Sequence, residues 1–287
     1  MTGARTLSAA DLQPLGKGGG HKYDEGHAVV VSGAMGRTGA ARLSARGALR
    51  IGAGLVTVAA PGSAMMECAA QLTAIMLRRC EDGEALAEML GDGRLNALCL
   101  GPGLGTDGRA GGLVDAAVAA RRSVVLDADA LTVLAGCDDP FAMLHDACVL
   151  TPHGGEFARL FPDIAERLDD MPKADATWEA AARAGCTVVF KGPETVIAGA
   201  DGRTWINDAT GDRAVPWLAT AGTGDVLAGM VTGLLARGLD PVDAASAAVW
   251  LHAEAARAFG PGLIAEDLPE MLPQVLRTLT GGARGQS

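Results

Sequence analysis

The chain has 287 residues, enough for one large α/β domain or two smaller ones with a well-buried core. Its formal net charge of -10 gives a surface that repels nucleic acid and anionic membranes, so we expect neither as a partner. Six cysteines without a CxxC pair or a metal-ligand spacing indicate reduced thiols, and together with the absence of a secretory signal they favour a cytoplasmic protein.

Short apolar runs alternate with helical patterns along the first two thirds of the chain. The expected strands are 28–31, 55–58, 97–100, 124–126, 148–150 and 187–190. The expected helices between them are 38–51, 63–70, 84–90, 109–120, 155–160 and 173–184. This alternation predicts an α/β fold with a mostly parallel central sheet and right-handed crossovers.

The pattern changes after Phe190. Residues 195–198 and 203–206 flank a turn at 199–202, which indicates a β-hairpin. Helices are then expected at 224–237, 241–259 and 267–279, before a glycine-rich end.

A glycine-rich turn, Gly222-Thr223-Gly224-Asp225, leads directly into one of these helices. Its glycines let the backbone approach a phosphate closely, and the N–H groups of the first helical turn stabilise the negative charge. Asp225 has two possible roles. It is either a favourable residue of the first helical turn or a base that takes a proton from a hydroxyl attacking the phosphate, and we favour the base.

Lys191 opens the segment 191–195 directly after a predicted strand. Ligands of open α/β sheets collect at the carboxyl ends of strands, so Lys191 is placed to meet a nucleotide. The alternative is a solvated lysine at the start of a turn. The segment Gly101-Pro102-Gly103-Leu104-Gly105 also follows a strand, but its glycine spacing does not match the dinucleotide-binding fingerprint.

Polar residues follow two more strands. Asp127 and Asp129 can hold Mg²⁺ directly or through water, which phosphoryl transfer requires, while a helix-capping role for Asp129 is an open alternative. His153 and Glu156 begin a helix at the same edge of the sheet, and we favour ligand contacts over a purely structural cap for both.

Taken together, these motifs resemble the ADP/ATP-dependent NAD(P)H-hydrate dehydratase family, which has the ribokinase-like fold. The similarity runs from about Lys17 to Phe259. It rests on Gly39-Ala40, the stretch 48–58, GPGLG at 101–105, DADAL at 127–131, the TPHxGE pattern at 151–156, the Lys191 segment and GTGDVLAG at 222–229.

The resemblance implies a ribokinase-like three-layer α/β/α sandwich at 17–280, preceded by an extension at 1–16 and followed by a flexible tail at 281–287. It also implies an activity that restores NADH or NADPH from the hydrated forms NADHX and NADPHX. ADP or ATP would phosphorylate the ring hydroxyl, and loss of phosphate would follow. Phosphate leaves well where hydroxide leaves poorly, and the lone pair of the ring nitrogen can expel it.

The same resemblance assigns residues to the two ligands. The hydrated cofactor would contact Ala40, Gly103, His153 and Asp225, and Asp225 also matches the catalytic base. The adenine nucleotide would be held by Lys191, Gly192, Pro193, Glu194, Thr195 and Gly224, with Gly222 and Thr223 of the same turn.

Two features bear on this assignment. The segment 208–221 is longer than the family pattern and carries Pro216-Trp217, which leaves the roles of this loop and of Asn207 open. Many relatives also carry an epimerase domain, so we expect the epimerase activity either in a separate NAD(P)H-hydrate epimerase or in a further part of the same gene product. We also expect a homo-oligomer. The competing hypotheses are a ribokinase-like kinase of a vitamin precursor alcohol and a non-catalytic protein that senses adenine nucleotides.

Overall fold

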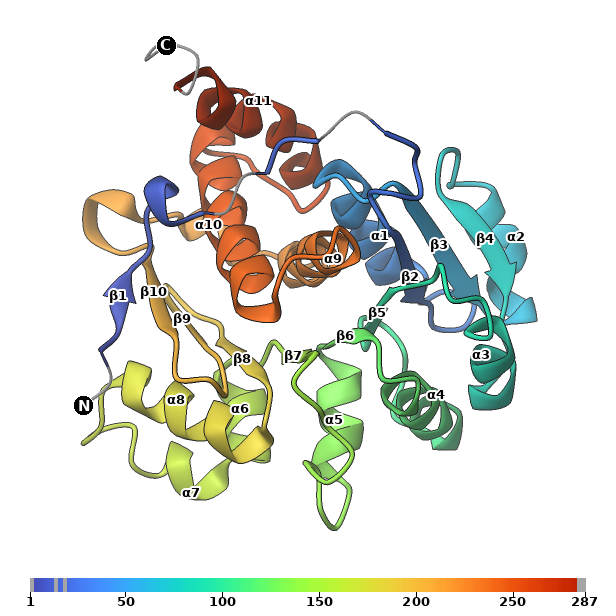
Figure 1. The fold of residues 1–287 in the computed structure, drawn as a ribbon, viewed down its shortest axis with the longest axis horizontal. Coiled ribbons are helices and arrows are strands. Elements are labelled where there is room, and N and C mark those ends of the chain that lie inside the picture. Colours follow the sequence, from blue (N-terminus) through green and yellow to red (C-terminus); the bar gives the residue numbers. More distant parts are fainter. Residues whose placement is uncertain (1–2, 13–14, 18–19, 283–287) are drawn as a thin grey trace.

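A mixed β-sheet runs through the centre of the molecule and carries helices on both faces (Figure 1). The computed structural model describes residues 3–12, 15–17 and 20–282. Within these residues the sheet has ten strands in the order β1-β10-β9-β8-β7-β6-β5-β2-β3-β4. Strand β9 is antiparallel to both of its neighbours, and all other pairs are parallel.

Eight of the ten described strands, all but β1 and β4, agree with the runs predicted from the sequence, including the hairpin. They are β1 (Arg5–Thr6), β2 (His27–Val31), β3 (Leu55–Ala60), β4 (Met76–Arg79), β5 (Ala97–Leu100), β6 (Ser123–Leu126), β7 (Cys148–Leu150), β8 (Thr187–Phe190), β9 (Glu194–Ala198) and β10 (Thr204–Asp208).

The helices begin and end within a few residues of the predicted boundaries. They are α1 (Gly39–Arg50), α2 (Met65–Ala69), α3 (Gly83–Met89), α4 (Gly108–Ala119), α5 (Asp129–Ala135), α6 (Gly154–Leu160), α7 (Pro162–Ala165), α8 (Lys173–Ala184), α9 (Thr223–Ala236), α10 (Pro241–Phe259) and α11 (Asp267–Gly282). No helix in the described part of the chain is long and apolar enough to cross a membrane.

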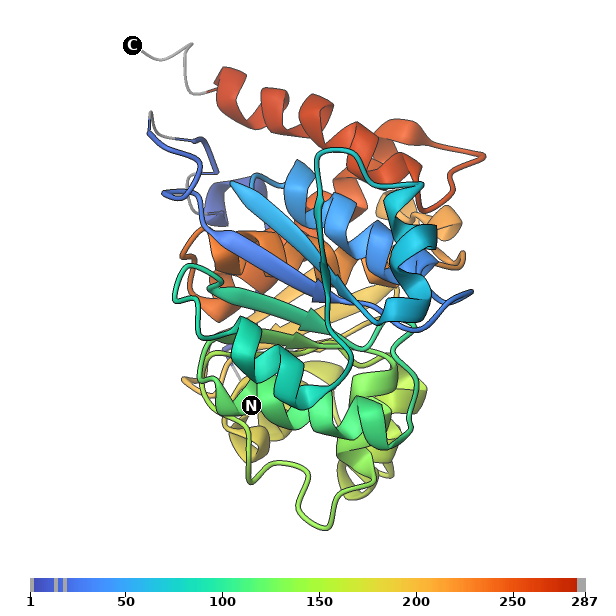
Figure 2. The same ribbon diagram turned by 90° about the vertical axis from the view of Figure 1, so that its right-hand side faces the viewer.

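The helices form two layers that bury two hydrophobic cores against the sheet (Figures 1 and 2). Helices α1, α9, α10 and α11 cover one face, and α3 to α8 cover the other. Strand β2 shows how the sequence produces this arrangement. Ala28 and Val30 pack into the first core, whereas Val29 and Val31 pack into the second, because successive side chains of a strand point to opposite faces. The predicted three-layer α/β/α sandwich is confirmed.

Four elements are absent from the sequence prediction. Strand β4 is an edge strand with the sequence Met-Leu-Arg-Arg and is mostly exposed, so it lacks the apolar pattern of the central strands. Helix α7 has four residues and β1 has two, too few to show a period, and the seven-residue helix α5 was not predicted either. Strand β1 belongs to the expected extension 1–16 and pairs with β10. Helix α11 continues to Gly282, and the rest of the expected tail, 283–287, lies outside the described residues.

The parallel strands bring their carboxyl ends to one edge of the sheet. Backbone hydrogen bonds extend the ladder beyond the strand ends: Asp127 N donates to Leu100 O at 3.1 Å, and Lys191 N donates to Pro152 O at 2.9 Å. The segments that follow these strands are therefore held side by side, although they lie far apart in the sequence.

Candidate active site

The GTGD turn forms the start of α9, as the sequence predicts. Gly222 is the N-cap residue with φ 90°, and its carbonyl accepts from Val226 N at 3.1 Å. The N–H groups of the next residues have no partner within the helix and can bind an anion. Thr223 Oγ1 anchors the turn by donating to Leu218 O at 2.9 Å and Thr220 O at 3.0 Å.

The two glycines of the turn have different roles. Gly222 has the left-handed conformation that favours glycine, and a Cβ there would lie 2.7 Å from Leu43 Cδ1 and 2.9 Å from Ala265 Cβ. Gly224 does not have a positive φ, and a Cβ on it would meet Lys191 Nζ at 3.6 Å, an ordinary contact distance. Gly224 is thus the open position of the turn, next to Lys191.

Asp225 lies in the first turn of α9 and is largely buried. Burial raises the pKa of Asp225 to about 6; the carboxylate of Asp127 adds to this rise, the ammonium of Lys191 opposes it, and Asp129 contributes a further small rise. An acid with a pKa near 6 is ionised at neutral pH and accepts a proton more readily than an ordinary aspartate. This position suits a general base.

Lys191 binds a carboxylate that the sequence analysis assigned to Mg²⁺. Its Nζ lies 2.7 Å from Asp127 Oδ1 and 4.0 Å from Glu156 Oε2. Burial alone would lower the pKa of Lys191, but the carboxylates of Asp127, Glu156 and Asp225 outweigh burial and raise it. The lysine therefore stays charged, and the alternative of a solvated lysine at a turn is wrong.

Asp129 joins two of the predicted motifs. Its Oδ2 accepts from Gly105 N at 2.8 Å, whereas Ala128 is the N-cap of α5, so the alternative of a helix cap at Asp129 is wrong. Ala128 has φ 46°, unusual for a residue with a side chain. Gly101 must be a glycine, since a Cβ there would lie 1.7 Å from Asp127 O.

His153 and Glu156 form a reciprocal cap on α6. His153 Nδ1 accepts from Gly155 N at 2.9 Å, and Glu156 Oε2 accepts from His153 N at 2.8 Å. The His153 side chain is nevertheless 60% exposed. The cap that we considered the weaker alternative is present, and it leaves most of the ring free to contact a ligand.

Ala40 and Gly103 are brought together as the resemblance implies. A Cβ on Gly103 would lie 3.6 Å from Ala40 Cβ and 2.7 Å from Arg37 O. A larger residue at 103 would therefore fill the space between Gly103 and Ala40. Ser44 links Ala40 to Asp225. Its Oγ donates to the backbone carbonyl of Asp225 at 2.8 Å and to that of Ala40 at 3.1 Å.

A largely apolar cavity of about 500 Å³ opens beside Lys191 and the GTGD turn. Its described lining residues are Lys191, Gly192, Pro193, Thr195, Asn207, Ala209, Thr210, Ala214, Val215, Pro216, Leu218, Ala219, Thr223, Gly224, Leu227, Val249, His252 and Ala253. This size and composition suit a small-molecule site. Glu194 and Gly222, which were predicted to bind the nucleotide, are not among these residues.

The cavity explains two features that the sequence left open. The long segment 208–221 forms one wall of it, and Asn207 lines it at 4% exposure. His252 of α10 also lines the cavity and was missed by the sequence analysis. Its Nε2 lies 2.9 Å from Thr223 O, and burial lowers the pKa of its ring to about 4, so the neutral ring supports the turn. The sequence contains little sign of this role, because His252 is one of several polar residues in an alanine-rich helix that also carries Ser246 and Glu254.

Among the described residues, no group of three or more His, Cys, Asp or Glu side chains is arranged to hold a metal ion. Asp127 binds Lys191 and Asp129 binds Gly105, so each carboxylate already has a partner. This donor set fits an ion held mostly by phosphate oxygens and water, as Mg²⁺ commonly is in nucleotide sites.

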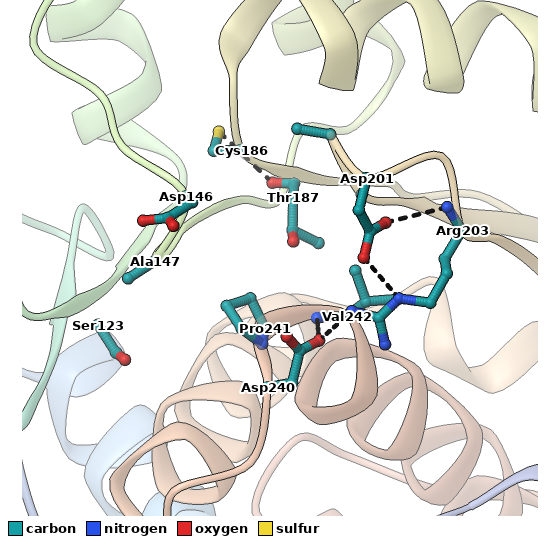
Figure 3. Close-up of a pocket in the computed structure, with 12 residues that line it drawn as sticks. Ser123, Asp146, Ala147, Cys186, Thr187, Asp201, Arg203, Asp240, Pro241 and Val242 are labelled. Carbon is teal, nitrogen blue, oxygen red and sulfur yellow. Dashed lines mark hydrogen bonds and ion pairs between the residues drawn. The ribbon is translucent and has the colours of Figure 1, made fainter.

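Another cavity, of about 300 Å³, lies at the opposite edge of the sheet (Figure 3). It is lined by the start of β6 at Ser123, the start of β8 at Thr187 and the start of α10. Arg203 binds Asp201 Oδ2 at 2.6 Å and Asp240 Oδ1 at 2.5 Å beside it. None of the predicted site residues lines this cavity.

The comparison with known proteins agrees with this geometry. The family described as NAD(P)H-hydrate dehydratase matches residues 28–276. The ADP-dependent (S)-NAD(P)H-hydrate dehydratase of Xanthomonas campestris is 34% identical and covers 98% of this chain and 100% of its own length. The bifunctional NAD(P)H-hydrate repair enzyme Nnr of Moorella thermoacetica is 38% identical over 96% of this chain and 54% of its own length.

Solved structures with a similar fold include a member of the same family. The ADP/ATP-dependent NAD(P)H-hydrate dehydratase of Bacillus subtilis, co-crystallized with ATP/Mg²⁺, has a TM-score of 0.80 at 29% identity over 96% of this chain and 99% of its own. A ribokinase-like protein of Enterococcus faecalis, with a TM-score of 0.81 at 23% identity over 97% of each chain, shares the fold. Although the chain spans about half the length of several curated relatives such as that of Moorella, it belongs to the NAD(P)H-hydrate dehydratase family.

Proposed function

We propose that this chain dehydrates the hydrated nicotinamide ring of NADHX or NADPHX at the expense of ADP or ATP. The observation that carries the proposal is the position of Asp225. A partly buried carboxylate with a raised pKa lies in the first turn of α9, next to Gly224 of the cavity, and Ser44 Oγ joins the backbone carbonyl of Asp225 to that of Ala40. Family membership supports the same reaction.

In the proposed reaction Asp225 accepts the proton of the ring hydroxyl as its oxygen attacks the terminal phosphorus of the nucleotide. The new oxygen–phosphorus bond forms while the bond to the leaving nucleotide breaks, and the backbone N–H groups of the GTGD turn hold the transferred phosphoryl group. The ring nitrogen lone pair then expels phosphate, and loss of a proton from the adjacent ring carbon restores the double bond. With ADP the products are the reduced cofactor, AMP and phosphate.

The other residues of the site bind and orient. Lys191, held by Asp127, presents its charge beside Gly224, where phosphate oxygens would lie. Gly192, Pro193 and Thr195, together with loop 208–221, line the apolar cavity that would enclose the nucleotide base. Mg²⁺, when bound with the nucleotide, would neutralise the phosphate charge, and Asp127 and Asp129 are the nearest candidate carboxylates.

The test is Asp225→Asn, measured by the return of the reduced-nicotinamide absorbance from hydrated NADH with Mg²⁺ and either ADP or ATP. We expect turnover to fall by about 10²–10⁴, the usual contribution of a general base, while nucleotide affinity measured by calorimetry stays near the wild-type value. The wild-type rate should rise with pH through about 6, where Asp225 ionises. A variant that retains more than half of the activity would contradict the role of Asp225.

The same assay separates the competing functions. A kinase of a precursor alcohol would leave hydrated NADH unchanged, and a nucleotide sensor would bind ADP without turnover of any substrate. The homo-oligomeric state, the cytoplasmic location and cooperation with a separate epimerase stay predictions from the sequence. Light scattering checks the oligomeric state, and cell fractionation checks the location. A coupled assay that starts from the other hydrate epimer checks the cooperation with an epimerase.

A further inference from the structure

A groove of about 770 Å³ follows the outer face of α1 and belongs to neither the nucleotide cavity nor the catalytic turn. One wall is the segment 71–75, which precedes β4, and the other includes Glu266 and Pro273 at the start of α11. In Figure 2, α11 lies above α1 and the segment after α2 extends toward it. The groove runs along the whole of α1, from Gly39 to Arg50, and 12 helical residues span about 18 Å.

The groove is cationic in a chain whose net charge is -10. Arg42, Arg46 and Arg50 lie one helical turn apart along α1, and Lys17 lies at the far end near Gly52. Carboxylates are also present. Glu266 lines the groove, and Glu270 binds Arg46 at 2.7 Å and Arg50 at 2.5 Å.

Arg42 differs from the other two arginines of α1. In the described part of the chain it forms no ion pair within 4 Å, and its Nε is buried without a hydrogen-bond partner. A buried donor without a partner is costly, so such a group commonly marks a place where a ligand or water binds. Arg42 therefore has donors free for an anion.

The groove comes next to the place where the proposed function puts the hydrated ring. Gly39, which lines the groove, is followed by Ala40, which faces Gly103. Leu43 borders both sites, because it lines the groove and its Cδ1 would lie 2.7 Å from a Cβ on Gly222. A ligand with its ring at Ala40 can thus enter the groove over Gly39, where a Cβ would lie 3.9 Å from Arg42 Nη2.

We propose that this groove binds the adenosine diphosphate arm of the hydrated dinucleotide and that Arg42 recognises its pyrophosphate. The proposal rests on the proposed function, which places the nicotinamide ring beside Ala40. A planar guanidinium matches phosphate oxygens with two parallel hydrogen bonds, and the apolar side chains of Leu49, Leu72 and Ile75 provide a surface for the adenosine.

The other two cavities fit this arm poorly. The cavity beside Lys191 is needed for the nucleotide that donates the phosphoryl group. The cavity in Figure 3 lies at the opposite edge of the sheet, and its carboxylates Asp146, Asp201 and Asp240 would repel a pyrophosphate. The groove along α1 combines unpaired positive charge with contact to the ring site.

The experiment compares two stable ligands that share the nicotinamide ring: NADH, which has the arm, and the reduced mononucleotide NMNH, which lacks it. Calorimetry with saturating ADP keeps the nucleotide cavity occupied. The variants are Arg42→Ala and, as a matched control, Arg94→Ala, an exposed arginine that is paired with Asp92 in the loop before β5.

We expect the wild type to bind NADH more tightly than NMNH, and Arg42→Ala to weaken NADH binding by about tenfold, the usual effect of losing a charge-assisted hydrogen bond. NMNH binding should stay unchanged in this variant, and Arg94→Ala should change neither ligand. Because NMNH reports the integrity of the ring site, a folding defect would reduce both ligands together.

Equal loss of NADH and NMNH in Arg42→Ala, or equal affinity of both ligands in the wild type, would overturn the proposal. These results are distinguishable from failure of the proposed function. Turnover of hydrated NADH with no effect of Arg42 on NADH binding would refute the groove alone. Arg42-dependent NADH binding without any turnover would refute the dehydratase reaction and support the groove.

Discussion

At the scale of single residues, the position of Asp225 suits catalysis and costs stability. In the unfolded chain its carboxyl has an ordinary pKa of 3.8, and burial raises that value to about 6 in the folded protein. The folded state therefore binds this proton more tightly than the unfolded state does. Stability contributed by this group is lost as pH rises from about 4 to about 6, and the ionised carboxylate destabilises the fold at neutral pH.

Asp225→Asn should consequently stabilise the protein at pH 8 by about 1–3 kcal/mol, since each pKa unit corresponds to about 1.4 kcal/mol. At pH 4 the gain should nearly vanish, because the wild-type carboxyl is then protonated in the folded state. Urea unfolding of both proteins at the two pH values measures the difference. An equal gain at both values would mean that ionisation of Asp225 is not its cause.

At the scale of elements, the two glycines of the GTGD turn have different effects: Gly222 allows the backbone conformation of the turn, and Gly224 leaves space beside Lys191. Gly222→Ala should lower the ligand-free melting temperature, because alanine is strained at φ 90° and its Cβ would meet Leu43 and Ala265. Gly224→Ala should leave that temperature nearly unchanged and instead reduce the increase caused by ADP or ATP, because a methyl group would occupy the approach of the phosphate.

Thermal unfolding with and without nucleotide separates the two effects, and each variant serves as the control of the other. The full wild-type increase on adding nucleotide to Gly224→Ala would show that this turn does not hold the phosphate. A ligand-free loss at Gly224 as large as that at Gly222 would contradict the assignment of the left-handed position.

At the scale of the whole molecule, close packing of α1 against α9 joins the two halves of the site. Gly229 makes this contact possible, because a Cβ there would lie 1.9 Å from Ser44 O. Gly229→Ala should destabilise the protein by about 1–3 kcal/mol or more through overpacking. It should also reduce turnover, since Ser44 bonds both Asp225 and Ala40.

Gly111→Ala in α4 is the matched control. No atom lies within 4 Å of a Cβ at this helical position, so alanine should stabilise the protein by about 0.4–1 kcal/mol. Denaturant unfolding and the turnover assay measure both variants. If both substitutions changed the free energy of unfolding in the same direction, the lack of space at Gly229 would not be the feature that sets the distance between α1 and α9.

The sequence by itself determined the alternation of strands and helices, the three-layer fold and the glycine-rich turn at the start of α9. These features depend on local patterns: buried apolar runs of three or four residues, and glycines at the start of a helix. It also indicated which strand ends carry polar residues, because parallel strands must end at one edge. The weak pattern of the edge strand β4 shows the limit of this reasoning, since exposure removes the apolar signal.

Only the tertiary structure decided which groups meet at that edge. Lys191 and Asp127 are 64 positions apart, and their pairing depends on the order of the strands and not on any local spacing. The pKa of Asp225, the position of loop 208–221 in the wall of the cavity beside Lys191 and the unpaired Nε of Arg42 likewise depend on packing by distant segments. Desolvation and charge pairing act through space, so a linear pattern shows the candidate groups and the fold determines their chemistry.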